Sequence, residues 1–205
     1  MAYVLGFFAA DGYITVNKRG GQFWCIDITD RKLIERIKLV INAEHKISVR
    51  KRGSGIYTSY RLQIGSIEMC DDLRRIGYSE RKTKSLSVPS VPNKYLSHFV
   101  RGYFDGDGNV WTGWIHKERK TKTLVIRTVF TSCSRNFLRE IRERLELFDI
   151  KRGVLRQGGG NYYRLTYSVF GSLKLSDFMY NNQNTSSLFL KRKRDVFERY
   201  KKMRL

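Results

Sequence analysis

The stretch VLGFFAADG at residues 4–12 has a near copy, VRGYFDGDG, at residues 100–108. Gly, Phe, Asp and Gly recur at the same four positions of both stretches, at one constant offset. That offset separates Asp11 from Asp107 and is nearly half of the 205-residue chain. Self-similarity at such a spacing indicates that the chain is an internal duplication.

The likeness between the two halves continues beyond these stretches. Residues 26–30 and the apolar residues at helical spacing after them correspond to residues 129–134 and a similar pattern. Asp30 and Ser134 are the expected N-caps of these two helices. Each half therefore predicts the order helix, strand, strand, helix, strand, strand, helix.

This order predicts an α+β fold with two pseudo-symmetric αββαββα half-domains, residues 1–88 and 97–205, each with an antiparallel sheet. Residues 89–96 are expected to link the halves, because Pro89 and Pro92 exclude a helix there. We expect this linker to run along the surface.

Alternation along the strands predicts that each sheet has one apolar and one basic face. In residues 57–64, Tyr60, Leu62 and Ile64 point to one side and Arg61 to the other. Arg50 stands in a similar alternation nearby.

The repeated stretches read as two helices that pack on each other. Small residues stand four apart in both, as in Gly102 and Gly106, and this spacing lets a second backbone approach closely. Gly108, like its counterpart in the first copy, is predicted to stop its helix in the left-handed conformation. Asp11 and Asp107 then stand in the last turns, and pairing of the helices brings their carboxylates together.

Two carboxylates at helix C-termini repel each other and the negative helix ends. A divalent metal ion removes this conflict. Mg²⁺ takes carboxylate and phosphate oxygens together with several waters, and it polarises an attacking water. The pattern therefore predicts metal-dependent hydrolysis of a phosphodiester, with one acid for each strand of a duplex.

The composition favours a nucleic-acid partner. The chain has 40 Lys and Arg against 19 Asp and Glu, a formal net charge of +21. Its three cysteines stand singly, which excludes a disulfide framework and a CxxC zinc site. No apolar run approaches a membrane span. We expect a soluble intracellular protein, cytoplasmic or organellar, with no membrane partner.

Both stretches resemble the LAGLIDADG motif of homing endonucleases, in the single-chain form with two motifs. The resemblance implies motif helices at a pseudo-dyad, saddle-shaped sheets in the DNA major groove, and a monomer that cuts double-stranded DNA with four-base 3′ overhangs. It implies Mg²⁺ as the cofactor, with Ca²⁺ or Mn²⁺ as substitutes in the site. It associates the chain with intron or intein mobility, leaves an intron, an intein or a free-standing gene open as its origin, and implies no protein partner.

The resemblance assigns roles to individual residues. Asp11 and Asp107 are the expected catalytic acids, and the expected metal-binding residues are Asp11, Asp107, Ala10 and Gly106. The family also uses a basic residue behind each metal site, and the resemblance makes Arg81-Lys82 and Arg192-Lys193 the candidates. Lys82 and Lys193 correspond to each other in the repeat, and Lys84 and Lys191 are alternatives close by. The expected DNA-binding residues are Lys18, Arg19, Arg50, Arg52, Arg61, Lys117, Arg119, Lys120, Lys122, Arg127, Arg152, Arg156 and Arg164.

One position departs from the motif. The first acid is Asp105 in the second copy but Ala9 in the first. Because the later acid is the family's metal ligand, cleavage is expected to survive this change. Asp105 is expected to hold a structural hydrogen bond in one half only.

Three classes of function remain open at this point. The first is a site-specific endonuclease. The second is a DNA- or RNA-binding protein on the same scaffold without cleavage, an intron maturase or a transcriptional regulator. The third is a basic structural protein of ribosome or nucleoid. Retention of both Asp11 and Asp107 favours the first over the second, and the internal duplication argues against the third.

Overall fold

Two units of packing make up the chain. The computed structural model describes residues 1–53, 57–80, 85–116, 118–181 and 187–204. By internal contacts, one unit is Met1–Lys82 with Pro89–Gly106, and the other is Thr83–Val88 with Asp107–Leu205. Both motif helices, except for the last residue of the second, pack within the first unit. The half-domain limits 1–88 and 97–205 stay a prediction about the repeat.

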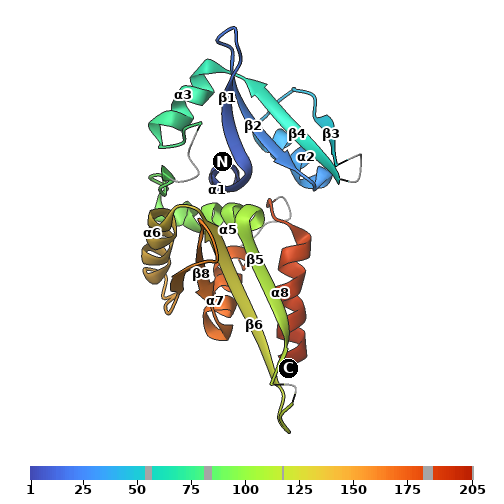
Figure 1. The fold of residues 1–205 in the computed structure, drawn as a ribbon, viewed down its shortest axis with the longest axis vertical. Helices are drawn as coiled ribbons and strands as arrows, with labels where there is room; N and C mark the ends of the chain where they lie inside the picture. Colours follow the sequence, from blue (N-terminus) through green and yellow to red (C-terminus); the bar gives the residue numbers. More distant parts are fainter. Residues whose placement is uncertain (54–56, 81–84, 117, 182–186, 205) are drawn as a thin grey trace. The chain divides into compact units, whose positions relative to one another are not determined.

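The first unit is an antiparallel sheet with helices against it (Figure 1). Its strand order is β1-β2-β4-β3. The elements are α1 (Ala2–Asp11), β1 (Gly12–Val16), β2 (Gln22–Ile28), α2 (Arg31–Val40), β3 (Ser48–Arg52), β4 (Tyr57–Gly65), α3 (Ile67–Arg75), the 3-10 turn η1 (Asn93–Tyr95) and α5 (Leu96–Asp107).

The second unit repeats this architecture. Its sheet has the order β5-β6-β8-β7, which matches the first strand for strand. The elements are β5 (Gly108–Ile115), β6 (Thr123–Ser132), α6 (Arg135–Glu146), β7 (Val154–Gln157), β8 (Tyr163–Tyr167), α7 (Val169–Tyr180) and α8 (Lys191–Arg204). The predicted αββαββα order is confirmed in both halves, and in the second half it is followed by α8, which packs on β5, β6 and α7.

The predicted two-faced sheet is confirmed in the first unit. Trp24, Ile26 and Leu62 are buried on one face. Asp27 and Arg61 lie on the other face and face each other across β2 and β4. The amphipathic helix α2 packs against β2 and β4. The core therefore lies between the helices and the apolar face, and the polar face is left to solvent.

Glycines set the close approach of α1 and α5, as the small-residue spacing predicts. A Cβ on Gly6 would lie 2.0 Å from the carbonyl oxygen of Phe99. A Cβ on Gly102 would lie 2.1 Å from the carbonyl oxygen of Tyr3. Backbone therefore meets backbone at both crossings, and no larger residue fits either position without moving a helix.

The prediction that Gly12 and Gly108 stop their helices in the left-handed conformation is wrong. Gly12 has φ −87° and ψ 157°, an extended conformation, and Gly108 is not among the described residues with positive φ. Each helix passes directly into a strand, so no reversal is needed. Space explains Gly12 instead, because a Cβ there would lie 2.0 Å from the ring of Phe8.

The predicted helix caps are confirmed, and residues 90 and 92–95 of the expected surface linker are exposed. The side chains of Asp30 and Ser134 accept hydrogen bonds from the third backbone amides beyond them. The Ser134 hydroxyl also donates to the carbonyl of Leu86. Leu86 and Val91 are buried. The segment between the halves is therefore anchored by hydrogen bonding in the second unit and by apolar burial in both units.

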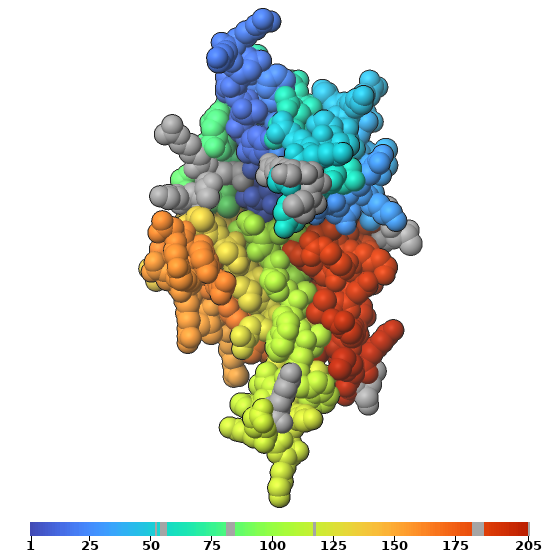
Figure 2. Space-filling model, turned by 45° about the vertical axis from the view of Figure 1, so that its right-hand side comes forward, coloured from blue at the N-terminus to red at the C-terminus, as the bar shows by residue number. Residues whose placement is uncertain are grey.

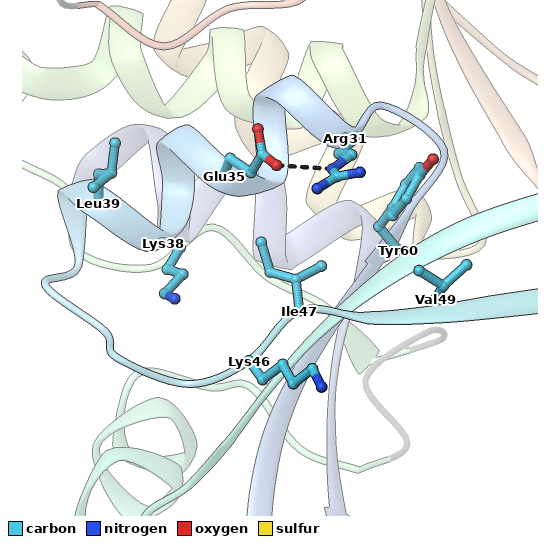
Figure 3. Close-up of a pocket in the computed structure, with 8 residues that line it drawn as sticks. All are labelled: Arg31, Glu35, Lys38, Leu39, Lys46, Ile47, Val49 and Tyr60. Carbon is cyan, nitrogen blue, oxygen red and sulfur yellow. Dashed lines mark hydrogen bonds and ion pairs between the residues drawn. The ribbon is translucent and has the colours of Figure 1, made fainter.

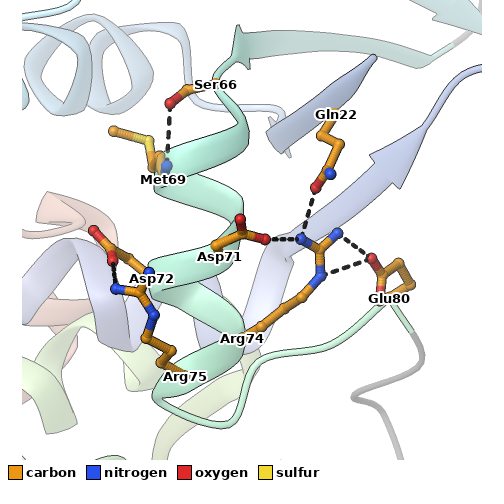
Figure 4. A network of polar contacts seen from close by, with 8 residues as sticks. All are labelled: Gln22, Ser66, Met69, Asp71, Asp72, Arg74, Arg75 and Glu80. Atoms are coloured by element: carbon orange, nitrogen blue, oxygen red, sulfur yellow. Dashed lines mark hydrogen bonds and ion pairs between the residues drawn. The ribbon is translucent and has the colours of Figure 1, made fainter. Parts of the chain in front are cut away.

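A polar network fixes α3 to the sheet of the first unit (Figure 4). Arg74 donates from Nη1 to Gln22 on β2 and to Asp71 one helical turn earlier, at 2.6 Å each. Its Nε and Nη2 donate to Glu80. One guanidinium thus joins a strand, a helix and the segment after the helix. Within the described ranges, no helix is long and apolar enough to cross a membrane.

Candidate functional site

In the first unit, Asp11 ends α1 directly against α5. Its side chain is half-buried. A Cβ on Gly106 would lie 3.0 Å from Oδ2 of Asp11 and 2.3 Å from the Cβ of Ala10. The glycine therefore admits the carboxylate and the α1 backbone beside it. Ala10 and Gly106, the predicted backbone neighbours of the metal, lie next to each other.

In the second unit, Asp107 ends α5 with an exposed side chain. The Nζ of Lys193 donates a 2.6 Å hydrogen bond to the carbonyl of Gly108, the residue after Asp107. Lys193 stands in the first turn of α8 and is only 6% exposed. The structure thus brings a buried ammonium group to the junction that carries the second motif acid. Its predicted counterpart, Lys82, lies outside the described residues.

The donor chemistry around the two acids fits a hard divalent ion. Asp11 and Asp107 both stand at helix C-termini, where the helix dipole adds negative potential. Over the described residues, no three or more His, Cys, Asp or Glu gather into a ready-made metal cage. Mg²⁺ suits such an open set, because it binds through one or two carboxylates and keeps places for water and phosphate. Pairing of the two acids in one site stays a prediction.

Asp105 makes the hydrogen bond expected in one half only. It is 2% exposed, and the Tyr3 hydroxyl donates a 2.8 Å bond to its Oδ2. Arg101 is also buried, 5.5 Å from the centre of the Tyr3 ring. The repeat places Ala9 and Phe99 where Asp105 and Tyr3 stand. One side of the helix pair is thus polar and its counterpart apolar, which accounts for the absence of an acid at position 9.

The predicted DNA-binding residues of the first unit lie on one turn and two neighbouring strands. Lys18 and Arg19 are exposed in the turn between β1 and β2, and Arg50 is exposed on β3. Arg52 ends β3. Arg61 shares the polar face with Arg50 by register but is half-buried, since it pairs with an acid of β2.

In the second unit, the predicted residues are spread along the polar face and its loops. The turn between β5 and β6, yellow-green in Figure 2, projects beyond the helices of this unit. Lys117 lies outside the described residues. The described members are all exposed, and they are Arg119, Lys120 and Lys122 in this turn, Arg127 on β6, and Arg152, Arg156 and Arg164 on or before β7 and β8.

Sequence reasoning missed three residues of the polar faces. Tyr13 and Asp27 bond each other beside Arg61. Trp111 is 49% exposed and pairs with Arg127 across β5 and β6. Asp27 lies directly opposite Arg61, so its role follows from strand register, which the sequence alone does not determine. Nothing in the sequence marks Trp111 as exposed rather than core.

A pocket of about 430 Å³ lies on the opposite, helix-covered side of the first sheet (Figure 3). Tyr60 lines it together with Arg31, which pairs with Glu35. Tyr60 therefore points toward α2 and away from the basic face, as the alternation predicts. This placement excludes Tyr60 from the set of side chains on the polar face.

Comparison with known proteins identifies the family. A model of the LAGLIDADG-like domain matches residues 1–77 and 94–175, so both motif stretches and most of both sheets are covered. The chain belongs to the LAGLIDADG family. The match in two segments agrees with the internal duplication.

Solved LAGLIDADG structures share the fold of the whole chain. The I-SmaMI homing endonuclease bound to cleaved DNA is similar with a TM-score of 0.66 at 12% identity, over 98% of this chain and 87% of that one. The I-AabMI meganuclease bound to uncleaved DNA gives 0.62 at 15%, over 98% and 88%. I-SmaMI with calcium ions and an uncleaved DNA target gives 0.64 at 13%, over 98% and 89%.

One curated relative has higher identity over a short stretch. A probable translation initiation factor IF-2 of Thermococcus kodakarensis is 37% identical over 84 residues. The match spans 38% of this chain and 6% of that protein. The chain therefore corresponds to a small part of that relative.

Proposed function

We propose that this LAGLIDADG-family chain is a site-specific endonuclease for double-stranded DNA. It hydrolyses one phosphodiester in each strand with divalent metal, Mg²⁺ in the cell, and leaves a staggered break with four-base 3′ overhangs. It acts as a monomer, because both motifs stand in one chain. One observation carries this proposal: each motif helix ends in an aspartate with a distinct setting. Asp11 lies where Gly106 lets α5 approach α1, and Asp107 precedes Gly108, whose carbonyl accepts a hydrogen bond from Lys193.

The chain's own residues have separate parts in this reaction. Asp11 and Asp107 would hold the metal, with the backbone at Ala10 and Gly106 beside them. The bound ion supplies Lewis-acid polarisation and lowers the pKa of a water. Lys193, fixed by the Gly108 carbonyl, places positive charge near the phosphate on which negative charge develops.

The basic sheet faces supply binding. Arginines and lysines on strands and projecting turns contact phosphates, which position a duplex, and base edges, which specify it. The described hairpin turns carry Lys18 and Arg19 in one unit and Arg119, Lys120 and Lys122 in the other. The DNA-bound relatives described above support this assignment by their fold.

Substitution of the motif acids tests the proposal. Asp11→Asn and Asp107→Asn should each abolish double-strand cleavage of a randomised DNA library in Mg²⁺, while duplex affinity stays within about tenfold. An amide keeps the size of the side chain but removes the charge that holds a cation. Asp72→Asn is the control, because this carboxylate on α3 is exposed, pairs with Arg75 and belongs to neither motif; it should cut like the parent.

The outcomes separate the competing functions. Specific DNA binding by the parent chain without any cleavage in Mg²⁺ or Mn²⁺ would replace the endonuclease with a binding protein. If both motif variants lose DNA binding as well as cleavage, the two acids have a structural role. Sequencing the ends of the cleaved library gives the recognition site and the length of the overhang in the same experiment.

A further inference from the structure

Equivalent rows of the two sheets carry different charges. In the first sheet, Arg61 faces Asp27 on one side and Ser48 on the other. In the second sheet, the equivalent Arg164 faces Thr131 and Arg156. The first row is therefore neutral and the second carries two positive charges, although the duplicated fold is the same.

The first row is a fixed assembly. Arg61 donates from Nε to Oδ1 of Asp27 at 2.9 Å and from Nη2 to Oδ2 at 2.6 Å. The Tyr13 hydroxyl donates to the same carboxylate at 3.1 Å, and the guanidinium stands 5.5 Å from the centre of the Tyr13 ring. The side chains of Arg61 and Asp27 are 13% and 14% exposed. Two parallel bonds and a ring contact leave the arginine a single orientation.

The geometry of the pair leaves one edge of the guanidinium unused. Arginine has five N–H groups, and Asp27 takes one from Nε and one from Nη2. Of the remaining hydrogens, one on Nη1 and one on Nη2 are parallel and form the end-on edge. That edge matches the O6 and N7 acceptors of a guanine in the major groove.

The electrostatics of the first row are those of a neutral unit. Burial alone would raise the pKa of Asp27, but the hydrogen bonds and charge of Arg61 lower it below its ordinary value, with smaller contributions from the Tyr13 hydrogen bond and the charge of Arg50. The carboxylate is therefore ionised at neutral pH and cancels the arginine's charge. An arginine whose charge is neutralised contributes little binding free energy toward a phosphate, because that attraction depends on net charge.

The second row lacks such a lock. Arg164 has no acid among its partners in the neighbouring strands. Its guanidinium stands 5.1 Å from the centre of the ring of Tyr162, in the loop between β7 and β8. Arg156 and Arg164 are both exposed on adjacent strands. Two like charges side by side favour a bound anion between or above them, and the DNA backbone supplies one.

We propose that Arg61, oriented by Asp27 and Tyr13, reads one guanine in the half-site bound by the first unit, whereas Arg164 with Arg156 grips backbone phosphate in the other half-site. Asp27 is thus a positioning residue for specificity. The inference rests on the proposed DNA binding but not on cleavage, and it makes the two halves of the duplication recognise DNA by different chemistry.

A binding selection tests the assignment. The full chain is equilibrated with a randomised duplex library in Ca²⁺, and base preferences are compared among variants. Arg61→Ala should reduce the preference for guanine at one position of one half-site by roughly 5- to 150-fold, the range for a bidentate contact. Asp27→Asn should reduce it at the same position and tighten binding to unrelated DNA. Arg61→Lys should not restore it, because lysine has no fork.

The matched control is Arg164→Ala in the second unit. It should weaken all sequences alike and reduce the slope of log affinity against log salt by about 0.9, as for one lost phosphate contact. The reciprocal variant Thr131→Asp should create a new base preference in the second half-site. Thermal unfolding of each variant shows whether the fold is retained.

The outcomes are distinct. If folded Arg61→Ala or Asp27→Asn leaves every base preference unchanged, or if Arg61→Ala lowers the salt slope as Arg164→Ala does, the guanine assignment is overturned. If Arg61→Ala does not fold, Asp27→Asn and Arg61→Lys decide alone. If the parent chain binds no duplex, the proposed function fails as well. That outcome is read from the parent alone and is therefore distinct from every result with a variant.

Discussion

Single glycines determine how close the two motif helices stand. A Cβ on Gly102 meets the carbonyl oxygen of Tyr3 at 2.1 Å, and a backbone atom cannot rotate away. Elsewhere in a helix, Gly→Ala stabilises by about 1 kcal/mol, since alanine has the higher propensity. At Gly102 the clash outweighs this gain, so the substitution is expected to destabilise the protein.

We therefore expect Gly102→Ala to lower the free energy of unfolding by about 1–3 kcal/mol or more, the usual cost of overpacking. Urea denaturation measures it. Gly159→Ala is the control, because a Cβ there meets nothing within 4 Å, and it should change stability by less than about 0.5 kcal/mol. A stabilised Gly102→Ala protein would show that the helices do not pack through this residue.

The charge of Asp27 links stability to pH. Burial favours the neutral acid, but Arg61 lowers its folded pKa below the unfolded value of about 3.9. For a depressed acid, the stabilisation is complete above the unfolded pKa and is lost as the pH falls through the folded one. The ion pair therefore stabilises the first unit at neutral pH and weakens only in acid.

Asp27→Asn should accordingly be less stable than the parent by a constant margin from about pH 7 to 5, and the margin should shrink below about pH 4. Chemical denaturation at each pH measures the margin. Asp72→Asn, which removes an exposed carboxylate, should stay within about 0.5 kcal/mol of the parent at pH 7. A margin that grows in acid would contradict the depressed pKa of Asp27.

At the scale of elements, the last helix, α8, supports the second motif junction. It packs on β5 and β6, and its first turn carries the buried Lys193 to the start of β5. A lysine buried on a helix that is itself held by the sheet has few alternative positions for its Nζ. The helix is thus a support that orients one charge at the second motif junction.

Lys193→Met keeps the length and the apolar packing of this side chain but removes the ammonium. On the proposed mechanism, the single-turnover rate of cleavage should fall at least about 100-fold, while duplex affinity changes by less than about tenfold. Arg192→Ala, an exposed neighbour in the same turn, is the control for general loss of charge. An unchanged cleavage rate in Lys193→Met would remove this residue from the site.

Elements defined by nearby residues could be predicted from the sequence, whereas features that depend on distant residues could not. The order of helices and strands follows from local periodicity and from comparison of the two halves. Caps at Asp30 and Ser134 are equally local. The conformation at Gly12 was mispredicted, because a helix that continues directly into a strand depends on the sheet that receives it.

The same distinction applies to the candidate site. Both motif acids are visible from the repeat alone. The hydrogen bond of Lys193 to Gly108 joins residues far apart in sequence. Lys193 was identified as a site residue by resemblance to a family and not by any local pattern. The pairing of Asp27 with Arg61 required strand register, which alternation restricts but does not determine.

At the scale of the whole molecule, the net charge of +21 is the dominant property. Asp27, Asp71 and Glu80 engage arginines of the first unit in local ion pairs. On the second sheet, Arg127, Arg156 and Arg164 are exposed strand residues without such neighbours in their rows. Counterion release from phosphate is therefore the expected main source of duplex affinity.

Affinity for duplex DNA should fall steeply with salt. The logarithm of the association constant should decrease linearly with log salt, with a slope of about −0.9 for each neutralised phosphate. With about 6–10 phosphate contacts, affinity drops roughly 10³- to 10⁵-fold between 50 and 200 mM salt. Fluorescence anisotropy with a selected target and with an unrelated duplex measures both slopes. Because phosphate contacts act on every sequence, the unrelated duplex should show a steep slope too. A slope near zero for both would mean that the positive charge serves another purpose and that the sheet faces do not bind backbone.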